Sequence, residues 1–330
     1  GVERTLAEDI HEWAECEAIV ERLYPELERR LAAVQPDLRI ARQGVKLKFN
    51  DFQLTTQEHV WPKLNKEDLL ATARKTWEER RSGRGVRLAH DKAAALGAAC
   101  AERDIALSVH APYYISMSSL EEDKRLHSID YLLQSCALVK ALGGRRVIFH
   151  SGSCGKQSRE EALEKALDTM ARAVKACDEA GFEDCILCPE TMGKVNQLGT
   201  LDEVLALCGV DERITPCIDF GHLNARTLGG IQSKADYAAI LDRMAEALGD
   251  ERARRFHVHF SRIEYSKGGE KRHWTFAETQ FGPEPQPLME LLAERGLAPV
   301  VICESAGTQA EDACTMQQMY RAARDLRKIL

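Results

Sequence analysis

Strand and helix patterns alternate along the chain from about residue 89 onward. Short apolar and β-branched runs, such as RRVIFH at 145–150 and PVVICE at 299–304, are separated by helical stretches, several of which end in glycine. Strands that are apolar on both faces are typical of a parallel sheet covered by helices. Six strand–helix pairs of this kind leave two candidate folds, a doubly wound sheet and a (β/α)8 barrel.

The residues that follow the predicted strands favour the barrel. Nearly every strand ends in a polar or metal-capable residue, whereas a doubly wound sheet gathers its ligands at one switch point. We therefore predict an α/β fold, a TIM barrel over residues 38–330, preceded by a helical N-terminal extension over residues 1–37. The barrel needs two more strands: residues 38–50 supply at least one, and GVRL at 85–88 is a poor candidate for the other. Amphipathic helices are predicted at 5–34 and 66–83.

Composition narrows the class of protein. At 330 residues and 44% hydrophobic the chain can bury a large core, and the lack of an apolar run of about 18 residues predicts no membrane span or membrane partner. The 11 cysteines fall in helix and strand patterns, which is typical of buried thiols in a reducing cytoplasm. Cys185 and Cys188 would point to opposite faces of a strand. The net charge of −7 is mildly against nucleic acid, although bound divalent cations would change it locally.

Metal-capable side chains recur where the predicted strands end or just beyond. Seven segments carry them: SVHAP, IFHSG, CPET, CIDFGH, HVHF, EKRH and ICES. Because a parallel barrel places its strand C-termini at one mouth, these side chains would converge there. They are His110, His150, Glu190, Asp219, His222, His257, His259, His273 and Glu304. Imidazole together with carboxylate suits zinc, manganese or ferrous iron, which predicts a polynuclear metal site.

Taken singly, each of these side chains has an ordinary structural explanation. A histidine at a strand end is most often a hydrogen-bonded structural residue, and Glu190 or Glu304 alone would fit a buried ion pair. The metal prediction rests on the coincidence of so many candidates at equivalent places. His257 and His259 share one face of a strand, so one of them is predicted to bind metal and the other to support it.

Seven motifs in a fixed order resemble the endonuclease IV family of apurinic/apyrimidinic endonucleases, within the xylose-isomerase-like barrels. They are HAPYYIS, FHSGS, PETMGK, CIDFGH, HVHFSRIEYS, GEKRH and ICES. The resemblance covers roughly residues 85–328 and is closest to a divergent branch of the family. It implies a TIM barrel with a trinuclear zinc site at its C-terminal mouth. It also implies a monomer that acts in base excision repair on DNA with abasic sites.

The resemblance assigns a role to each candidate. It places His110 and His150 at the first zinc, Asp219, His259 and Glu304 at the second, and His222 and His273 at the third, with Glu190 bridging the first two. Glu190 and Glu304 are also the predicted catalytic residues, and His257 is predicted to support the ligands from behind.

The sequence departs from the family at the third zinc. The family motif is Asp-Arg-His, but the residue two before His273 is Lys271, and an ammonium group is not a zinc ligand. Glu270, one position earlier, replaces the aspartate only if the loop shifts; otherwise water completes the site or Lys271 itself faces the phosphate. Two or three zinc ions therefore remain open.

The family also inserts side chains of its mouth loops into the DNA minor groove. The matching residues here are Tyr113 and Tyr114, and we predict further DNA contacts from Arg262, Lys271 and Arg272. The alternative for the tyrosines is that both pack beneath a neighbouring loop.

Three functions are compatible with these observations. The leading hypothesis is a metal-dependent phosphodiesterase that cleaves DNA 5′ to abasic sites by a metal-activated hydroxide. The alternative is a xylose-isomerase-like sugar isomerase or epimerase with one or two metals. A non-catalytic protein that binds damaged DNA is the third. Three bound metals would favour the first hypothesis, one or two the second, and none the third.

Overall fold

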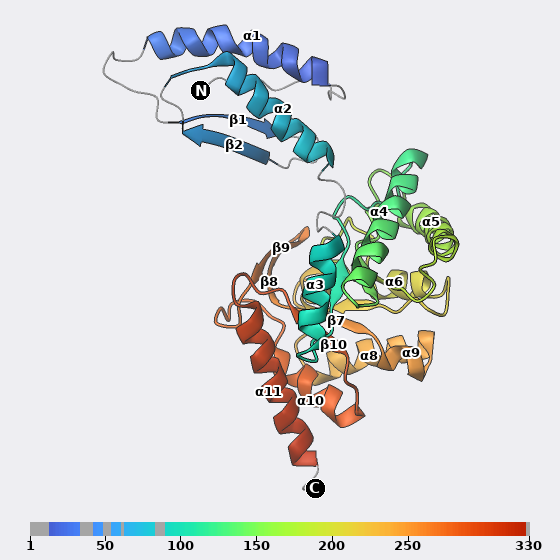
Figure 1. Cartoon of the computed structure of the whole chain (residues 1–330). Helices are drawn as coiled ribbons and strands as arrows, with labels where there is room; N and C mark the ends of the chain where they lie inside the picture. Colours follow the sequence, from blue (N-terminus) through green and yellow to red (C-terminus); the bar gives the residue numbers. More distant parts are fainter. Residues whose placement is uncertain (1–12, 34–41, 49–53, 61–62, 83–89, 328–330) are drawn as a thin grey trace. The chain divides into compact units, whose positions relative to one another are not determined.

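The computed structural model describes residues 13–33, 42–48, 54–60, 63–82 and 90–327, and its contacts divide the chain into two units (Figure 1). The units are Gly1–Gly85 and Val86–Leu330. The division therefore lies after Gly85 rather than after residue 37, where the helical extension was expected to end.

The first unit combines two helices with an antiparallel hairpin. α1 (Trp13–Ala32) and α2 (Lys66–Ser82) pack against each other, and both agree with the predicted helices. β1 (Arg42–Lys48) pairs with β2 (Leu54–Val60), and α2 packs on both strands.

The prediction that residues 38–50 supply a barrel strand is wrong. β1, with the sequence RQGVKLK, belongs to the first unit and pairs antiparallel with β2. It alternates polar and apolar residues, which suits a hairpin rather than a barrel strand buried on both faces. Its partner is only a few residues along the chain, so the pairing costs little loop entropy. GVRL at 85–88 lies entirely outside the described residues.

The second unit carries the parallel strands that the sequence predicts. They are β3 (Ser108–His110), β4 (Arg146–Phe149), β5 (Ile186–Pro189), β6 (Cys217–Asp219), β7 (His257–Phe260) and β10 (Val300–Cys303). β3, β4 and β5 pair in that order, as do β6, β7 and β10, and a parallel bridge between Glu190 and Cys217 joins the two groups. The predicted TIM barrel is confirmed.

Helices follow the strands along the chain and surround them (Figure 1). They are α3 (His90–Ala101), α4 (Glu122–Ala141), α5 (Arg159–Glu179), α6 (Leu201–Cys208), α7 (Phe220–Arg226), α8 (Lys234–Leu248), α9 (Asp250–Arg254), α10 (Pro285–Arg295) and α11 (Gln309–Arg327). The sequence did not predict α7, α9 or the antiparallel hairpin of β8 (Arg262–Ser266) and β9 (Gly269–Trp274).

The strands are apolar on both faces, as the sequence indicates. On β4, Val147 and Phe149 belong to the large core cluster that includes helix residues, whereas Ile148 packs with Cys188 and Cys217 in a second, smaller cluster. Alternating side chains of a strand point to opposite faces, so the smaller cluster lies on the other face of the barrel wall.

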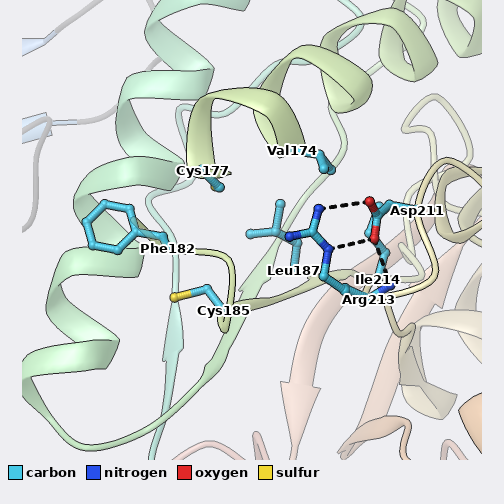
Figure 2. A pocket seen from close by; sticks show the side chains of 8 residues that line it. All are labelled: Val174, Cys177, Phe182, Cys185, Leu187, Asp211, Arg213 and Ile214. Atoms are coloured by element: carbon cyan, nitrogen blue, oxygen red, sulfur yellow. Dashed lines mark hydrogen bonds and ion pairs between the residues drawn. The ribbon is translucent and has the colours of Figure 1, made fainter. Parts of the chain in front are cut away.

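All 11 cysteines are free, and most are buried. Figure 2 shows a small hollow lined by Val174, Cys177, Phe182, Cys185, Leu187, Asp211, Arg213 and Ile214. Cys185 Sγ contacts the carbonyl oxygen of Cys136, whereas Cys188 Sγ contacts the hydroxyl of Thr215. The two thiols of the CxxC pair therefore have separate surroundings. Among the described residues, no helix is long and apolar enough to cross a membrane.

Candidate metal centre

Glu190, the residue after β5, lies at the centre of the candidate site and is fully buried. Its two oxygens face different histidines. Oε2 lies 3.1 Å from His110 Nε2 and 3.2 Å from His150 Nε2, whereas Oε1 lies 2.7 Å from His259 Nδ1. Burial alone would raise the pKa of Glu190, but the three histidines outweigh it and hold the pKa well below its usual range. One ionised carboxylate thus serves two groups of ligands.

The group on the Oε1 side is rich in carboxylates. The nearest candidate ligand atoms of Glu190, Asp219, His259 and Glu304 all lie within 4.8 Å of one another. Burial alone would lower the pKa of His259, but Glu190 and the other carboxylates raise it to about 9. Burial raises the pKa of Glu304, and the negative charge of Glu190 adds to the increase. Like charges this close repel unless a cation lies between them.

Asp219 shows how the fold positions a ligand. β6 ends at Asp219 and α7 begins at the next residue, so Asp219 is the N-cap of α7. Its Oδ1 accepts a 2.7 Å hydrogen bond from the backbone N–H of His222, which explains the three-residue spacing of the pair. Within the described part of the chain, the buried Oδ2 has no hydrogen-bond partner. A buried acceptor left unpaired is costly, so this oxygen fits a metal ligand.

Three histidines have their Nδ1 atom held by a neighbouring oxygen. His110 Nδ1 lies 2.8 Å from the carbonyl oxygen of the next residue. His222 Nδ1 lies 3.0 Å from the carbonyl oxygen of Thr191, and His273 Nδ1 lies 2.8 Å from Ser261 Oγ. Contacts of this kind orient the imidazole ring in metal sites and leave Nε2 for the ion.

His222 and His273 form a third group of ligands near Glu270. Glu270 Oε2 lies 3.4 Å from His222 Nε2, and Glu270 Oε1 lies 3.7 Å from His273 Nε2. Burial alone would raise the pKa of Glu270, but the two histidines outweigh it and lower the pKa to about 2. Glu304 is also close, because its carboxylate and both imidazoles offer atoms within 4.8 Å of one another. Lys271 forms an ion pair with Glu264 instead.

His257 lies against His259, with the ring centroids 5.2 Å apart and the planes at 76°. Burial lowers the pKa of His257 to about 3, so the ring is neutral. Neither ring nitrogen has a hydrogen-bond partner among the described residues. Its supporting role stays a prediction. Cys217, opposite His257 on β6, forms a close group with both histidines, and the sequence analysis missed it because an apolar strand context carries no metal signal.

The two tyrosines predicted to contact DNA differ in their surroundings. Tyr113 is 72% exposed and stacks on His110, with the ring centroids 5.6 Å apart. Tyr114 is partly buried, and its ring lies 6.4 Å from that of Tyr131 on α4. The structure therefore places Tyr113 beside the candidate metal centre, whereas the Tyr114 ring lies near α4; DNA contacts by the two tyrosines stay predictions.

The predicted cationic contacts also differ. The prediction for Arg262 is wrong: the side chain is buried and donates to the carbonyl oxygen of Phe281 and to Glu284. Arg272 is exposed and lies over the Trp274 ring, 5.3 Å from its centroid. Lys271 is exposed as well, so DNA contacts by these two residues stay predictions.

The fold matches a defined class of barrel. The profile of the family described as xylose isomerase-like TIM barrel matches residues 71–326, well over half of the chain. The chain belongs to this family. A second profile, the impB/mucB/samB family C-terminal domain, matches residues 1–104.

The relatives found by sequence match a short part of the chain. DNA polymerase IV from Cronobacter sakazakii is 99% identical over 88 residues, which are 27% of this chain and 25% of that protein. DNA polymerase IV from Citrobacter koseri is 88% identical over 88 residues, with the same coverage of 27% and 25%. The chain thus spans about a quarter of the length of these curated relatives.

Two solved structures share the barrel fold. A D-tagatose 3-epimerase-like protein aligns with a TM-score of 0.53 at 18% identity, over 73% of this chain and 85% of that one. Endonuclease IV from Thermus thermophilus aligns with a TM-score of 0.52 at 20% identity, over 74% of this chain and 86% of that one. At these identities the likeness shows the fold, and the two scores do not separate the two chemistries.

Proposed function

We propose that the barrel is a metal-dependent phosphodiesterase that resembles endonuclease IV and cleaves DNA 5′ to abasic sites. The observation that carries the proposal is the buried carboxylate of Glu190, whose two oxygens face two separate groups of ligands. A shared carboxylate of this kind suits a pair of cations, the arrangement used in many phosphodiester cleavages. The donors suit zinc, with manganese and iron as the other candidates.

Different residues of the chain would hold the two ions. His110 and His150 would hold one ion and Asp219, His259 and Glu304 the other, with Glu190 between them. When bound, the ions would supply a nucleophile from water and stabilise the charge on the leaving oxygen. Among the carboxylates of the second group, Glu304 is the most exposed, with a 28% exposed side chain. We assign it the role of orienting the attacking water.

Tyr113 supports a nucleic-acid substrate. Its exposed ring is stacked on His110, so a flipped nucleotide that reaches the metal centre would contact it. Extruding an abasic nucleotide costs less than extruding a paired base, because little stacking is lost. An exposed aromatic ring then offers a surface on which a neighbouring base can stack.

The sugar isomerase or epimerase is the second candidate. The group of Glu190, Asp219, His259 and Glu304 is sufficient by itself for one cation. An epimerase with that ion alone leaves His110, His150, His222 and His273 without a role, although their nitrogen atoms face carboxylates. An epimerase with two ions would still leave one pair of these histidines without a role. The number of converging ligands therefore supports the nuclease over the epimerase.

The first unit gives separate support for a DNA partner. Its near identity to part of a DNA polymerase favours a contribution to DNA binding. We expect a chain lacking residues 1–85 to bind duplex DNA more weakly, with the metal content of the barrel unchanged. Fluorescence anisotropy with an abasic duplex measures the binding, and equal affinity of the two chains would contradict this contribution.

The direct test of the proposed function is cleavage of a labelled duplex with one abasic site. The metal-loaded protein is expected to cut 5′ to the lesion, to leave an undamaged duplex intact, and to stop when a chelator is added. A parallel assay offers ketohexoses to the same protein. Ketohexose turnover without DNA cleavage would establish the epimerase. Tight binding of the lesion without either reaction would establish the non-catalytic protein.

A further inference from the structure

We propose that Glu270 supplies the carboxylate of a third cation site with His222 and His273, and that Lys271 is an extra residue which a β-bulge turns out of the site. The inference deepens the proposed function and rests on it for its use in catalysis. The geometry of the third site, however, is a property of the β8–β9 hairpin and of the loop after β5.

The bulge lies in the pairing of β8 with β9. In a regular strand, residues two apart share a face, so Lys271 would accompany His273. The register instead shifts between Glu264 and Tyr265: Glu264 is opposite Arg272, and Tyr265 is opposite Glu270. Lys271 has no partner of its own in this ladder, which identifies it as the extra residue of a bulge.

The bulge changes which side chains share a face. Glu270 and His273, three positions apart, both reach the same group, and the carboxylate lies 3.7 Å from His273 Nε2. The Lys271 ammonium lies 2.5 Å from Glu264, and its side chain is 53% exposed. The carboxylate thus takes the inner position, and the cation of Lys271 pairs with another residue of the hairpin.

Backbone contacts hold Glu270 in this position. Its N–H donates to the carbonyl oxygen of Gly193 at 3.1 Å, and the N–H of Val195 donates to the carbonyl oxygen of Gly268 at 3.1 Å. The hairpin is therefore fastened to the loop that follows β5, the strand that ends just before Glu190. The placement of Glu270 does not depend on side-chain packing alone.

The approach of the two segments requires glycine. A Cβ atom at Gly193 would lie 2.6 Å from Glu270 Cβ and 3.0 Å from His222 Cδ2. A Cβ atom at Gly269 would lie 2.1 Å from the carbonyl oxygen of Gly193, and the φ of Gly269 is +90°. Any larger residue at either position would push Glu270 away from His222.

The bulge accounts for Lys271 at the position two before His273, where the endonuclease IV motif has aspartate. Without Lys271 the segment would read Glu270, Arg272, His273, a carboxylate two residues before a histidine. That is the spacing of the Asp-Arg-His motif in the endonuclease IV family, with glutamate in place of aspartate. One inserted residue, absorbed by the bulge, accounts for the difference.

The test is the number and affinity of bound zinc ions. The full chain is loaded with zinc and dialysed against graded chelator, and zinc per chain is measured by plasma mass spectrometry. The variants are Glu270→Gln, Glu270→Asp, Lys271→Ala and deletion of Lys271. Glu264→Gln is the matched control, because it removes an acid from the same hairpin that lies outside the site. Circular dichroism checks that each variant is folded.

We expect three ions in the unmodified chain and two in Glu270→Gln. Replacing residues that only support a ligand lowers metal affinity by about 10- to 100-fold, so loss of the ligand itself should weaken the third ion by at least about tenfold. Glu270→Asp should retain part of that affinity. Glu264→Gln, Lys271→Ala and the Lys271 deletion should each keep three ions, the deletion because a regular hairpin then presents Glu270.

Two results would overturn the inference. One is a Glu270→Gln chain that binds zinc with the stoichiometry and affinity of the unmodified chain. The other is a Lys271 variant that loses an ion as readily as Glu270→Gln. Failure of the proposed function looks different, because a chain that holds three ions but leaves abasic DNA intact would refute the nuclease and keep the third site.

Discussion

The Glu190 end and the Glu270 end of the candidate metal centre are built from different parts of the fold. Around Glu190 the ligands follow neighbouring strands of the parallel wall, each held by its partners. Around Glu270 they come from α7 and from β9, a strand of a two-stranded hairpin. An extra residue inside the wall would move every later side chain of that strand to the opposite face. The hairpin absorbs one as a bulge. The Glu190 end, with its rigid frame, therefore keeps the motifs that resemble endonuclease IV, and the Glu270 end departs from that resemblance.

The largest effect is expected at Glu190, the shared carboxylate. Glu190→Gln should lower cleavage of an abasic duplex by about 10³-fold or more, because an amide cannot balance the charge of two cations. Circular dichroism should show an unchanged fold, and zinc analysis should show loss from both groups that Glu190 joins. Near-normal turnover by this variant would disprove the shared-ligand arrangement.

Stepwise removal of metal should show that the Glu270 end of the site binds its ion more weakly than the Glu190 end. We expect graded chelation to release the ion at His222, His273 and Glu270 first, because its ligands come from the hairpin and its edge is partly exposed. Complete removal should lower the melting temperature, since an ion present at 100 times its Kd stabilises the native state by about 2.7 kcal/mol. Zinc analysis and differential scanning fluorimetry along one chelator series measure both. Simultaneous release of all ions would show that the two ends hold their ions equally tightly.

A smaller effect is expected at Tyr113, whose exposed ring stacks on His110. Tyr113→Ala should weaken binding of an abasic duplex by about tenfold, because one base–aromatic stack contributes about 1–3 kcal/mol. Tyr113→Phe keeps the ring and should bind normally. Anisotropy titrations compare the two variants, and equal weakening by both would mean that the hydroxyl, not the ring, makes the contact.

The smallest effect is expected at Arg272, an exposed cation of the β8–β9 hairpin. Arg272→Ala should weaken binding to damaged and undamaged duplexes alike and reduce the salt dependence of log K by about one phosphate contact. Titrations at several salt concentrations measure this slope. A selective loss for the abasic duplex would show instead that the outer face of the hairpin reads the lesion.

Much of the candidate site was predictable from local sequence. A short apolar run followed by a metal-capable residue indicates both a buried strand and the position of its end. His110, His150, Glu190 and Asp219 were found in this way, and the structure brings them together. The same reasoning located the six parallel strands. It succeeds because the C-terminal ends of parallel strands meet at one mouth whatever their exact order.

The partners of each segment were decided only by the tertiary structure. The sequence predicts a barrel strand at β1, but β1 pairs antiparallel with β2. Arg262 read as a DNA contact, but its guanidinium is buried against Phe281 and Glu284. The proposed use of Glu270 in place of the aspartate of the endonuclease IV motif depends on a bulge, which exists only as a mismatch between two paired strands. Local sequence thus determined which residues end each strand. Pairing between distant segments decided which way Glu270 and Lys271 point, because register is a property of two strands together.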